Sequence, residues 1–266
     1  MRPCEFSRLK ENVMDLNLGL ICHLFTVEEW VEAPIYVVLP AILLVCACAY
    51  LLGSINSAII ISKLLYHEDI RTKGSGNAGM TNMHRNYGLG AAGLTLLGDL
   101  GKTVLAIAIA GFVFGFRYTP FVVSVSDMCY VAGLFAVIGH VFPVFYKFKG
   151  GKGVLATATM ALVLSPISFA ILILIFIGIV FFSRYVSLGS VIAAVLYPVV
   201  MHGHFAVFQT YMPALTALAI ILLACLIVWC HRANLKRIGD RTENKLSFGK
   251  KKVEPEPASD ESGDEE

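Results

Sequence analysis

Residues 74–85 read GSGNAGMTNMHR, and they form the longest polar interruption between Pro34 and Trp229 in an otherwise apolar stretch. Arg71 and Lys73 come just before this glycine-rich segment. Glycine permits positive φ and close backbone approach, so successive N–H groups can point toward one anion. The segment therefore predicts a phosphate-binding loop at a membrane surface, although the same composition is also typical of a plain turn between two helices. Its spacing is not that of a P-loop.

The composition indicates a membrane protein. The chain has 266 residues, of which 57% are hydrophobic and 15% are charged. Soluble domains carry about 25% charged residues, so we expect an integral membrane protein with one polytopic domain. The seven cysteines form no CxxC pair, and we interpret them as small hydrophobic side chains.

Apolar runs separated by polar segments predict an all-α integral membrane fold with seven transmembrane helices. The expected spans are about 35–65, 89–116, 127–141, 154–164, 167–182, 191–200 and 212–230. They form one domain, residues 34–246, between an N-terminal extension, residues 1–33, and an acidic tail, residues 247–266. The tail combines acidic residues with Pro and Ser, so we expect it to be disordered.

Two of the predicted spans contain polar residues. Residues 53–58 of the first span are small and polar enough for close helix packing or for lining a cavity. In the second span, Asp99 and Lys102 are three residues apart, so they share a helix face and can form an ion pair. Charges within a membrane often mark a functional site, but a buried structural ion pair is an equal alternative.

The distribution of basic residues predicts the orientation. Sixteen of the 21 Lys and Arg residues lie on one predicted side of the membrane, four lie on the other, and Lys102 lies within a span. The positive-inside rule then places the N-terminus outside the cell and the C-terminus in the cytoplasm. Four polar segments share the cytoplasmic face, namely residues 74–85, 147–153, 183–190 and the basic segment from His231 onward. Their convergence predicts a binding site on that face.

The residue types on this face favour phosphate recognition by charge. Glu68, Asp69, Asp240 and Glu243 are the only acids there before the tail, too few for a two-metal phosphatase. There is no His spacing for zinc and no GxSxG for a serine hydrolase. We therefore expect no metal, no cofactor and no nucleic-acid partner, but a positive pocket that stabilises developing negative charge.

Four motifs occur in order between about residues 36 and 246. The first is Asp69-Ile-Arg71, then Gly74-Ser75-Gly76-Asn77-x-Gly79-x-Thr81-Asn82-x-x-Arg85, then Asp99 and Lys102. The second is Gly139-His140-x-Phe142-Pro143-x-Phe145-x-x-Phe148-Lys149-Gly150-Gly151-Lys152-Gly153. The third is Ser183-Arg184-Tyr185-Val186-Ser187, and the fourth is His231-Arg232-x-Asn234 with Arg237, Gly239, Glu243 and Lys245. Together they resemble the PlsY-type glycerol-3-phosphate acyltransferases, which are bacterial membrane enzymes.

The resemblance implies a seven-helix fold with an extracellular N-terminus. It also implies transfer of a fatty acyl group from acyl-phosphate to the 1-hydroxyl of sn-glycerol 3-phosphate, giving lysophosphatidate and phosphate. This is the first acylation step of phospholipid synthesis, at the cell (inner or plasma) membrane, with the active site on the cytoplasmic face. The family needs no metal, and the soluble enzyme that makes acyl-phosphate is a natural partner.

The resemblance carries over site residues by matching positions. The catalytic core is expected to comprise Ser75, Arg85, Lys152, Ser187, His231 and Asn234. Phosphate or substrate binding is expected from Arg71, Gly74, Gly76, Asn77, Gly79, Thr81, Asn82, His140, Lys149, Gly150, Gly151, Gly153, Arg184, Arg237, Glu243 and Lys245. His231 is expected either to act as a general base or only to position substrate. Met80 departs from the family, which usually has Ala there.

Two other functions are compatible with parts of the chain. A transporter for organophosphate anions would suit the intramembrane charges, but the polar residues gather on one face and do not line a path across. A scaffold whose basic segment, residues 232–252, binds anionic lipid would not need the glycine-rich loops. The acyltransferase accounts for all four motifs.

Overall fold

The computed structural model describes residues 35–115, 124–208 and 211–246, and within these ranges it contains helices and no strand. The predicted extension and acidic tail lie outside the described residues. The elements are α3 (Ile35–Ser54), α4 (Ser57–Tyr66), the 3₁₀ turn η1 (Ile70–Thr72), α5 (Met80–Gly115), α6 (Val125–Val141), the 3₁₀ turn η2 (Val144–Tyr146), α7 (Val154–Leu164), α8 (Pro166–Ser183), α9 (Val186–Phe208), α10 (Ala214–Cys230) and α11 (Arg232–Gly239).

Five helical stretches in the described part are long and apolar enough to cross a membrane. They are Val38–Tyr66, Met80–Phe114, Val125–Tyr146, Pro166–Ser183 and Val186–Phe208. The count becomes six if α10 and α11, which meet at a 51° bend, form one span. Helix α7 has 11 residues, which is about 16 Å of helix and too short for a hydrocarbon core of about 30 Å. Seven transmembrane crossings therefore stay a prediction.

Two helices are longer than the apolar runs suggested. Helix α5 begins at Met80 rather than near residue 89, and it bends at Gly88, where φ is 83°. Helix α9 covers Val186–Phe208 rather than residues 191–200. The polar residues that seemed to end the spans are accommodated inside the helix, because Ser190 Oγ donates to the carbonyl of Val186 at 3.0 Å and so needs no outside partner.

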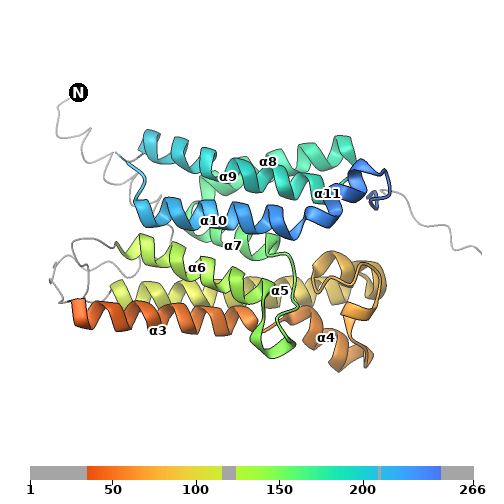
Figure 1. Cartoon of the computed structure of the whole chain (residues 1–266), viewed down its shortest axis with the longest axis horizontal. Helices are drawn as coiled ribbons and strands as arrows, with labels where there is room; N and C mark the ends of the chain where they lie inside the picture. The colour runs from red at the N-terminus through yellow and green to blue at the C-terminus, as the bar shows by residue number, and fades with distance from the viewer. Residues whose placement is uncertain (1–34, 116–123, 209–210, 247–266) are drawn as a thin grey trace, which may run out of the picture.

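The helices form two groups with α7 between them (Figure 1). Helices α3–α6 pack together as one group, chiefly through contacts of α3 with α6 and of α5 with α6. Helices α8–α11 form the other, in which α9 contacts α8 and α10. Helix α7 contacts α5, α6 and α8, while α10 also contacts α6. The turn η1, the α8–α9 connection and α11 lie at one end of the bundle, on the right in Figure 1, and we call it the site end.

Small residues bring α3 and α6 into close contact, as residues 53–58 predicted. A Cβ on Gly53 would collide with the backbone of Ala136, and one on Gly139 would collide with the backbone of Tyr50. The first span breaks just after this contact, and Asn56 caps α4 by accepting a hydrogen bond from the Ile59 N–H at 3.1 Å. Close packing thus fixes where the break occurs.

The predicted ion pair within the second span is confirmed. Lys102 Nζ lies 2.8 Å from Asp99 Oδ1, and both side chains are at most 4% exposed. Lys102 also donates to the Ile55 carbonyl at 2.8 Å, while the Ser57 hydroxyl donates to Asp99 at 3.1 Å. The pair therefore ties the α3–α4 break to α5 and satisfies a backbone carbonyl that the break leaves without a helical partner.

Candidate active site

A cavity of about 470 Å³ lies between the two helix groups at the site end. Its walls come from the glycine-rich segment before α5, from α5 itself, from α7, α8 and α9, and from α10 and α11. The lining is chemically divided. Near the loops it is polar and basic, whereas deeper in the bundle it is apolar, with Leu155, Ala158 and Ala161 of α7 and Phe169, Leu172 and Phe176 of α8.

Four side chains from four segments of the chain form a hydrogen-bonded network at the polar end. Lys152 Nζ donates to Asn234 Oδ1 at 2.6 Å. The Asn234 amide nitrogen donates to Glu243 Oε1 at 2.6 Å and to Ser187 Oγ at 2.9 Å. The Ser187 hydroxyl in turn donates to Glu243 Oε1 at 2.6 Å. The segment before α7, the start of α9, helix α11 and the segment after α11 are therefore held in one arrangement.

Glu243 is the acceptor on which this network converges, because Arg237 Nε also donates to it at 2.7 Å. Its side chain is 7% exposed. Burial acts to raise the pKa of Glu243, but the hydrogen bonds from Ser187, Asn234 and Arg237 outweigh it and hold that pKa below its usual range. Glu243 thus stays ionised and neutralises part of the local positive charge.

Lys152 is a half-buried basic side chain at the polar end of the cavity. Burial lowers the pKa of Lys152 below its ordinary value, and the charge of Glu243 partly restores it. A partly desolvated ammonium attracts an anion more strongly than a solvated one. The side chain of Arg85, by contrast, is exposed and makes no hydrogen bond or ion pair with another described residue. Both line the cavity and leave donors available for a ligand.

His231 stands at the bend between α10 and α11 and is 3% exposed. Its Nδ1 lies 2.8 Å from the carbonyl of Ile227. Because a carbonyl oxygen can only accept, Nδ1 carries the proton, and the lone pair of the neutral ring is on Nε2. His231 lines the cavity, so its imidazole can accept a hydrogen bond from a bound hydroxyl.

Asn82 organises the glycine-rich segment from inside. Its amide nitrogen donates to the carbonyls of Ile70, Lys73 and Asn77 at 3.0–3.2 Å, and its amide oxygen accepts from the Ser75 N–H at 3.1 Å. The side chain is buried, and these contacts use all its donors. Asn82 therefore shapes the loop, and Ser75, which is exposed and lines the cavity, is the residue the loop presents.

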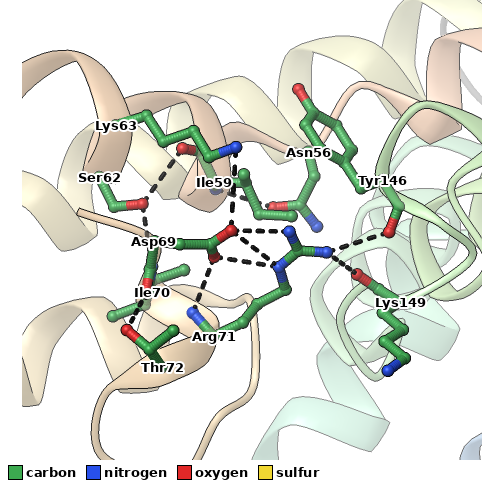
Figure 2. A network of polar contacts seen from close by, with 10 residues as sticks. All are labelled: Asn56, Ile59, Ser62, Lys63, Asp69, Ile70, Arg71, Thr72, Tyr146 and Lys149. Atoms are coloured by element: carbon green, nitrogen blue, oxygen red, sulfur yellow. Dashed lines mark hydrogen bonds and ion pairs between the residues drawn. The ribbon is translucent and has the colours of Figure 1, made fainter. Parts of the chain in front are cut away.

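Arg71 joins the first glycine-rich segment to the second. Figure 2 shows its guanidinium between Asp69 on one side and the loop of Tyr146 and Lys149 on the other. The two nitrogens facing Asp69 make a bidentate pair, with distances of 2.7–3.2 Å. The third donates to the carbonyls of Tyr146 and Lys149 at 3.0 and 3.3 Å. Arg71 holds the two loops together and does not line the cavity.

The glycerol-3-phosphate acyltransferase family model matches residues 43–241 of the chain. The chain belongs to this family. It is 38% identical to the glycerol-3-phosphate acyltransferase of Bacillus subtilis (strain 168) over 207 residues, which cover 78% of this chain and 98% of the relative. It is 42% identical to that of Geobacillus kaustophilus (strain HTA426) over 205 residues, covering 77% of this chain and 96% of the relative.

Two solved structures have a fold similar to that of this chain. Both are crystal structures of PlsY (YgiH), an integral membrane glycerol 3-phosphate acyltransferase. The glycerol 3-phosphate form has a TM-score of 0.67 and 33% identity, and it covers 77% of this chain and 96% of PlsY. The lysophosphatidic acid form has a TM-score of 0.65 and 32% identity, with 77% and 95% covered. This acyltransferase is accordingly an integral membrane protein of phospholipid synthesis, and none of these relatives is named as a transporter or scaffold.

The acyltransferase brings most of the expected site residues to one cavity. All six expected catalytic residues line it, and so do eight of the expected binding residues: Asn77, Gly79, Thr81, Asn82, His140, Gly153, Arg237 and Glu243. The other eight do not line it: Arg71, Gly74, Gly76, Lys149, Gly150, Gly151, Arg184 and Lys245. The departing residue Met80 lines the cavity and is 39% exposed.

The residues that stay outside the cavity support its walls. Gly150 and Gly151 pair with the end of α6 through N–H···O=C bonds of 3.1 Å each to Val141 and His140. The Arg184 carbonyl accepts from the Leu246 N–H at 2.7 Å. Lys245 Nζ lies 5.7 Å from the centre of the Tyr185 ring. These contacts hold the second glycine-rich segment and the segment after α11 against the bundle.

Several residues that line the cavity were not among the expected site residues. Asn244 and Ser190 lie in or beside motifs, at positions where the residue type alone does not mark a ligand. Thr157, Phe169 and Tyr197 sit within continuous apolar helices. Their sequence neighbours are just as apolar and face lipid or core, so hydrophobicity does not separate cavity-lining residues from the others.

Proposed function

We propose that this acyltransferase transfers a fatty acyl group from acyl-phosphate to the 1-hydroxyl of sn-glycerol 3-phosphate, with lysophosphatidate and phosphate as products. The observation that carries the proposal is the divided lining of this one cavity, which is polar and basic at one end and apolar at the other. Lys152, Arg85 and the Ser75 loop offer donors and positive charge to phosphate groups. Directly beyond them, α7, α8 and α9 offer an apolar wall that an acyl chain can contact.

Charge complementarity supports phosphate as the bound group. Glu243 neutralises Arg237, which is its close ion-pair partner. Lys152 donates a hydrogen bond to the neutral amide of Asn234, so the charge of Lys152 is not cancelled by direct contact with a carboxylate. Arg85 has no ion-pair partner among the described residues. The polar end therefore has a net positive charge that attracts phosphate groups.

The reaction needs positioning more than it needs a strong base. An acyl-phosphate is a mixed anhydride, so its carbonyl carbon is already reactive toward a hydroxyl. Attack forms the new ester C–O bond, breaks the C–O bond to phosphate, and releases a phosphate that can take the hydroxyl proton. We propose that His231 Nε2 and the Asn234–Ser187 network orient glycerol 3-phosphate for this attack, which is catalysis by proximity, without a covalent acyl-enzyme.

The orientation and membrane of the enzyme belong to the same proposal. The asymmetry of Lys and Arg residues supports an extracellular N-terminus and a site end that faces the cytoplasm. Both substrates carry phosphate groups that do not cross a bilayer unaided, so a cytoplasmic opening suits their supply. We propose the cell (inner or plasma) membrane as the location, residues 34–246 as the acyltransferase domain, and the soluble acyl-phosphate-forming enzyme as a partner.

The test is product formation by purified protein in lipid. Palmitoyl-phosphate is supplied with and without glycerol 3-phosphate, and lysophosphatidate and phosphate are measured; palmitoyl-CoA is supplied as the competing donor. We expect acceptor-dependent release from palmitoyl-phosphate only, and its loss in Lys152→Ala. Lys236→Ala is the matched control, because Lys236 is an exposed base on α11 that does not line the cavity. Folded protein that makes no lysophosphatidate from either donor would overturn the proposal, and product from palmitoyl-CoA alone would overturn the choice of donor.

A further inference from the structure

One face of α9 forms a wall of the cavity, and the size of its lining side chains changes along the helix. Its lining residues are Val186, Ser187, Ser190, Ala193, Ala194 and Tyr197. They recur at helical spacing, so they lie along one face. From Ser187 to Ala194 this face carries small side chains, and at Tyr197 it carries the largest lining side chain of the helix. Met201, one turn further, is fully buried and does not line the cavity.

The lining ends at matching places on α7 and α8. On α7 the last lining residue is Ala161, and Leu164 beyond it is buried in the core. On α8 the lining residue nearest the α7–α8 turn is Phe169. Helices α8 and α9 are joined by a short turn and are antiparallel, and Gly189 packs against Phe176. Counted from this contact, Phe169 lies seven residues back along α8 and Tyr197 lies eight residues forward along α9, so the two side chains lie at similar depth.

We infer that Tyr197 is the floor of the acyl-chain section of the cavity and limits the length of the chain that is transferred. The inference rests on the proposed function. Ser187 in the polar network and Tyr197 are ten residues apart on α9, which is about 15 Å along the helix axis. A chain whose carbonyl lies beside Ser187 and His231 therefore reaches the Tyr197 ring after a fixed number of methylenes.

The ring of Tyr197, rather than its hydroxyl, makes the floor. Tyr197 is 2% exposed, so the ring cannot swing into solvent to admit a longer chain. Its hydroxyl has no hydrogen-bond partner among the described residues. Removing a buried hydroxyl that is already unpartnered leaves no other group unsatisfied. Tyr197→Phe thus keeps the floor, whereas Tyr197→Ala opens it.

The experiment measures kcat/KM with acyl-phosphates of graded chain length for four variants and the wild type. We expect Tyr197→Ala to move the optimum to longer chains, because each further methylene that enters an apolar pocket gains affinity; two of them correspond to about a tenfold gain. Ala194→Phe, which fills the section above the floor, moves the optimum to shorter chains. Tyr197→Phe keeps the wild-type length profile, and so does Val195→Ala, since Val195 is 52% exposed on the opposite face.

The two proposals fail in different ways. Wild-type protein that transfers no acyl chain of any length overturns the proposed function. Active protein in which Tyr197→Ala keeps the wild-type chain-length optimum overturns the assignment of Tyr197. A second readout, the rise in Tm caused by lysophosphatidates of graded chain length, compares the same variants without turnover. An unchanged length dependence of that rise in Tyr197→Ala contradicts the floor as well.

Discussion

In the buried part of the bundle, Lys102 of α5 donates a hydrogen bond to Nδ1 of His140 on α6 over 2.9 Å. The other two donors of this ammonium go to Asp99 and to the carbonyl of Ile55, both at 2.8 Å. An ammonium has three donors and no acceptor, so Nδ1 of His140 must accept and the ring proton is on Nε2. His140 lines the cavity. Lys102 therefore determines the tautomer of this ring, in which Nε2 carries the proton.

Lys102→Met is expected to destabilise the protein strongly. The substitution leaves Asp99 as a buried charge without its cation, and breaking a buried pair in this way costs about 3–5 kcal/mol. Thermal unfolding in detergent measures the loss as a fall in Tm. In Lys102→Met with Asp99→Asn, the uncompensated charge is gone, so a large part of the lost stability should return. If the double variant unfolds as early as the single one, the charge is not the cause.

Gly151→Ala is expected to disturb the cavity through His140. A Cβ at residue 151 would overlap His140 Nε2 and would come within 2.8 Å of the carbonyl oxygen of Ala78, which is backbone and cannot move aside easily. We expect a Tm several degrees lower and a drop in kcat/KM, since Lys152 follows directly. Gly178→Ala is the matched control, because a Cβ there meets nothing within 4 Å. Equal effects of the two substitutions would contradict the close contact.

The convergence of the expected catalytic residues on one cavity could be predicted from the sequence, because these residues are polar within an apolar chain. Ser75, Lys152 and His231 each belong to a short polar segment on the same predicted side of the membrane, and all three line the cavity. The sequence could not show which polar residues face substrate. Arg71 and Asn82 have the residue types of ligands, yet their donors are used by the loops themselves. That distinction depends on tertiary contacts between segments far apart in the chain.

The helical class and the approximate positions of the apolar helices were more predictable than the ends of those helices. The first span was expected to be continuous over about residues 35–65, but it breaks after Ser54. The ion pair of Lys102 did follow from two charged residues three apart in an apolar run. The ends of α9 did not, since Ser187 and Ser190 are polar but lie inside the helix. The apolar wall of the cavity was equally hidden, because Tyr197 lies in a helix whose other faces are also apolar.

Glu243→Gln is expected to lower stability in a pH-dependent way. The folded pKa of Glu243 lies below its ordinary value, which is about 4.3. Its ionised form therefore stabilises the fold above that pH, and this contribution disappears as the pH falls through the lower, folded value. The Tm difference between wild type and Glu243→Gln should thus be largest near pH 6–7 and shrink below about pH 4.

The expected Tm change of Glu243→Gln is small, and Asp240→Asn is its control. A loss on the order of 1 kcal/mol shifts Tm by about 2–4 °C in a domain of this size. Asp240→Asn removes a carboxylate from the same segment without touching Ser187, Asn234 or Arg237, so it should lower Tm less. A Tm difference for Glu243→Gln that grew as the pH fell would have the wrong sign for a carboxylate stabilised by these donors.

His231→Gln separates the two roles that the imidazole could have. The Gln side chain can still accept a hydrogen bond from the acceptor hydroxyl, but it cannot take a proton. If His231 positions substrate, the variant should raise KM for glycerol 3-phosphate and keep kcat within about tenfold, whereas losing a general base costs about 10²–10⁴-fold in rate. The measurement is kcat at saturating concentrations of both substrates across pH 6–9. His84→Gln, an exposed histidine that does not line the cavity, is the control. A kcat reduced a hundredfold or more at saturation, with KM unchanged, would make His231 the base and remove the leaving phosphate from that role.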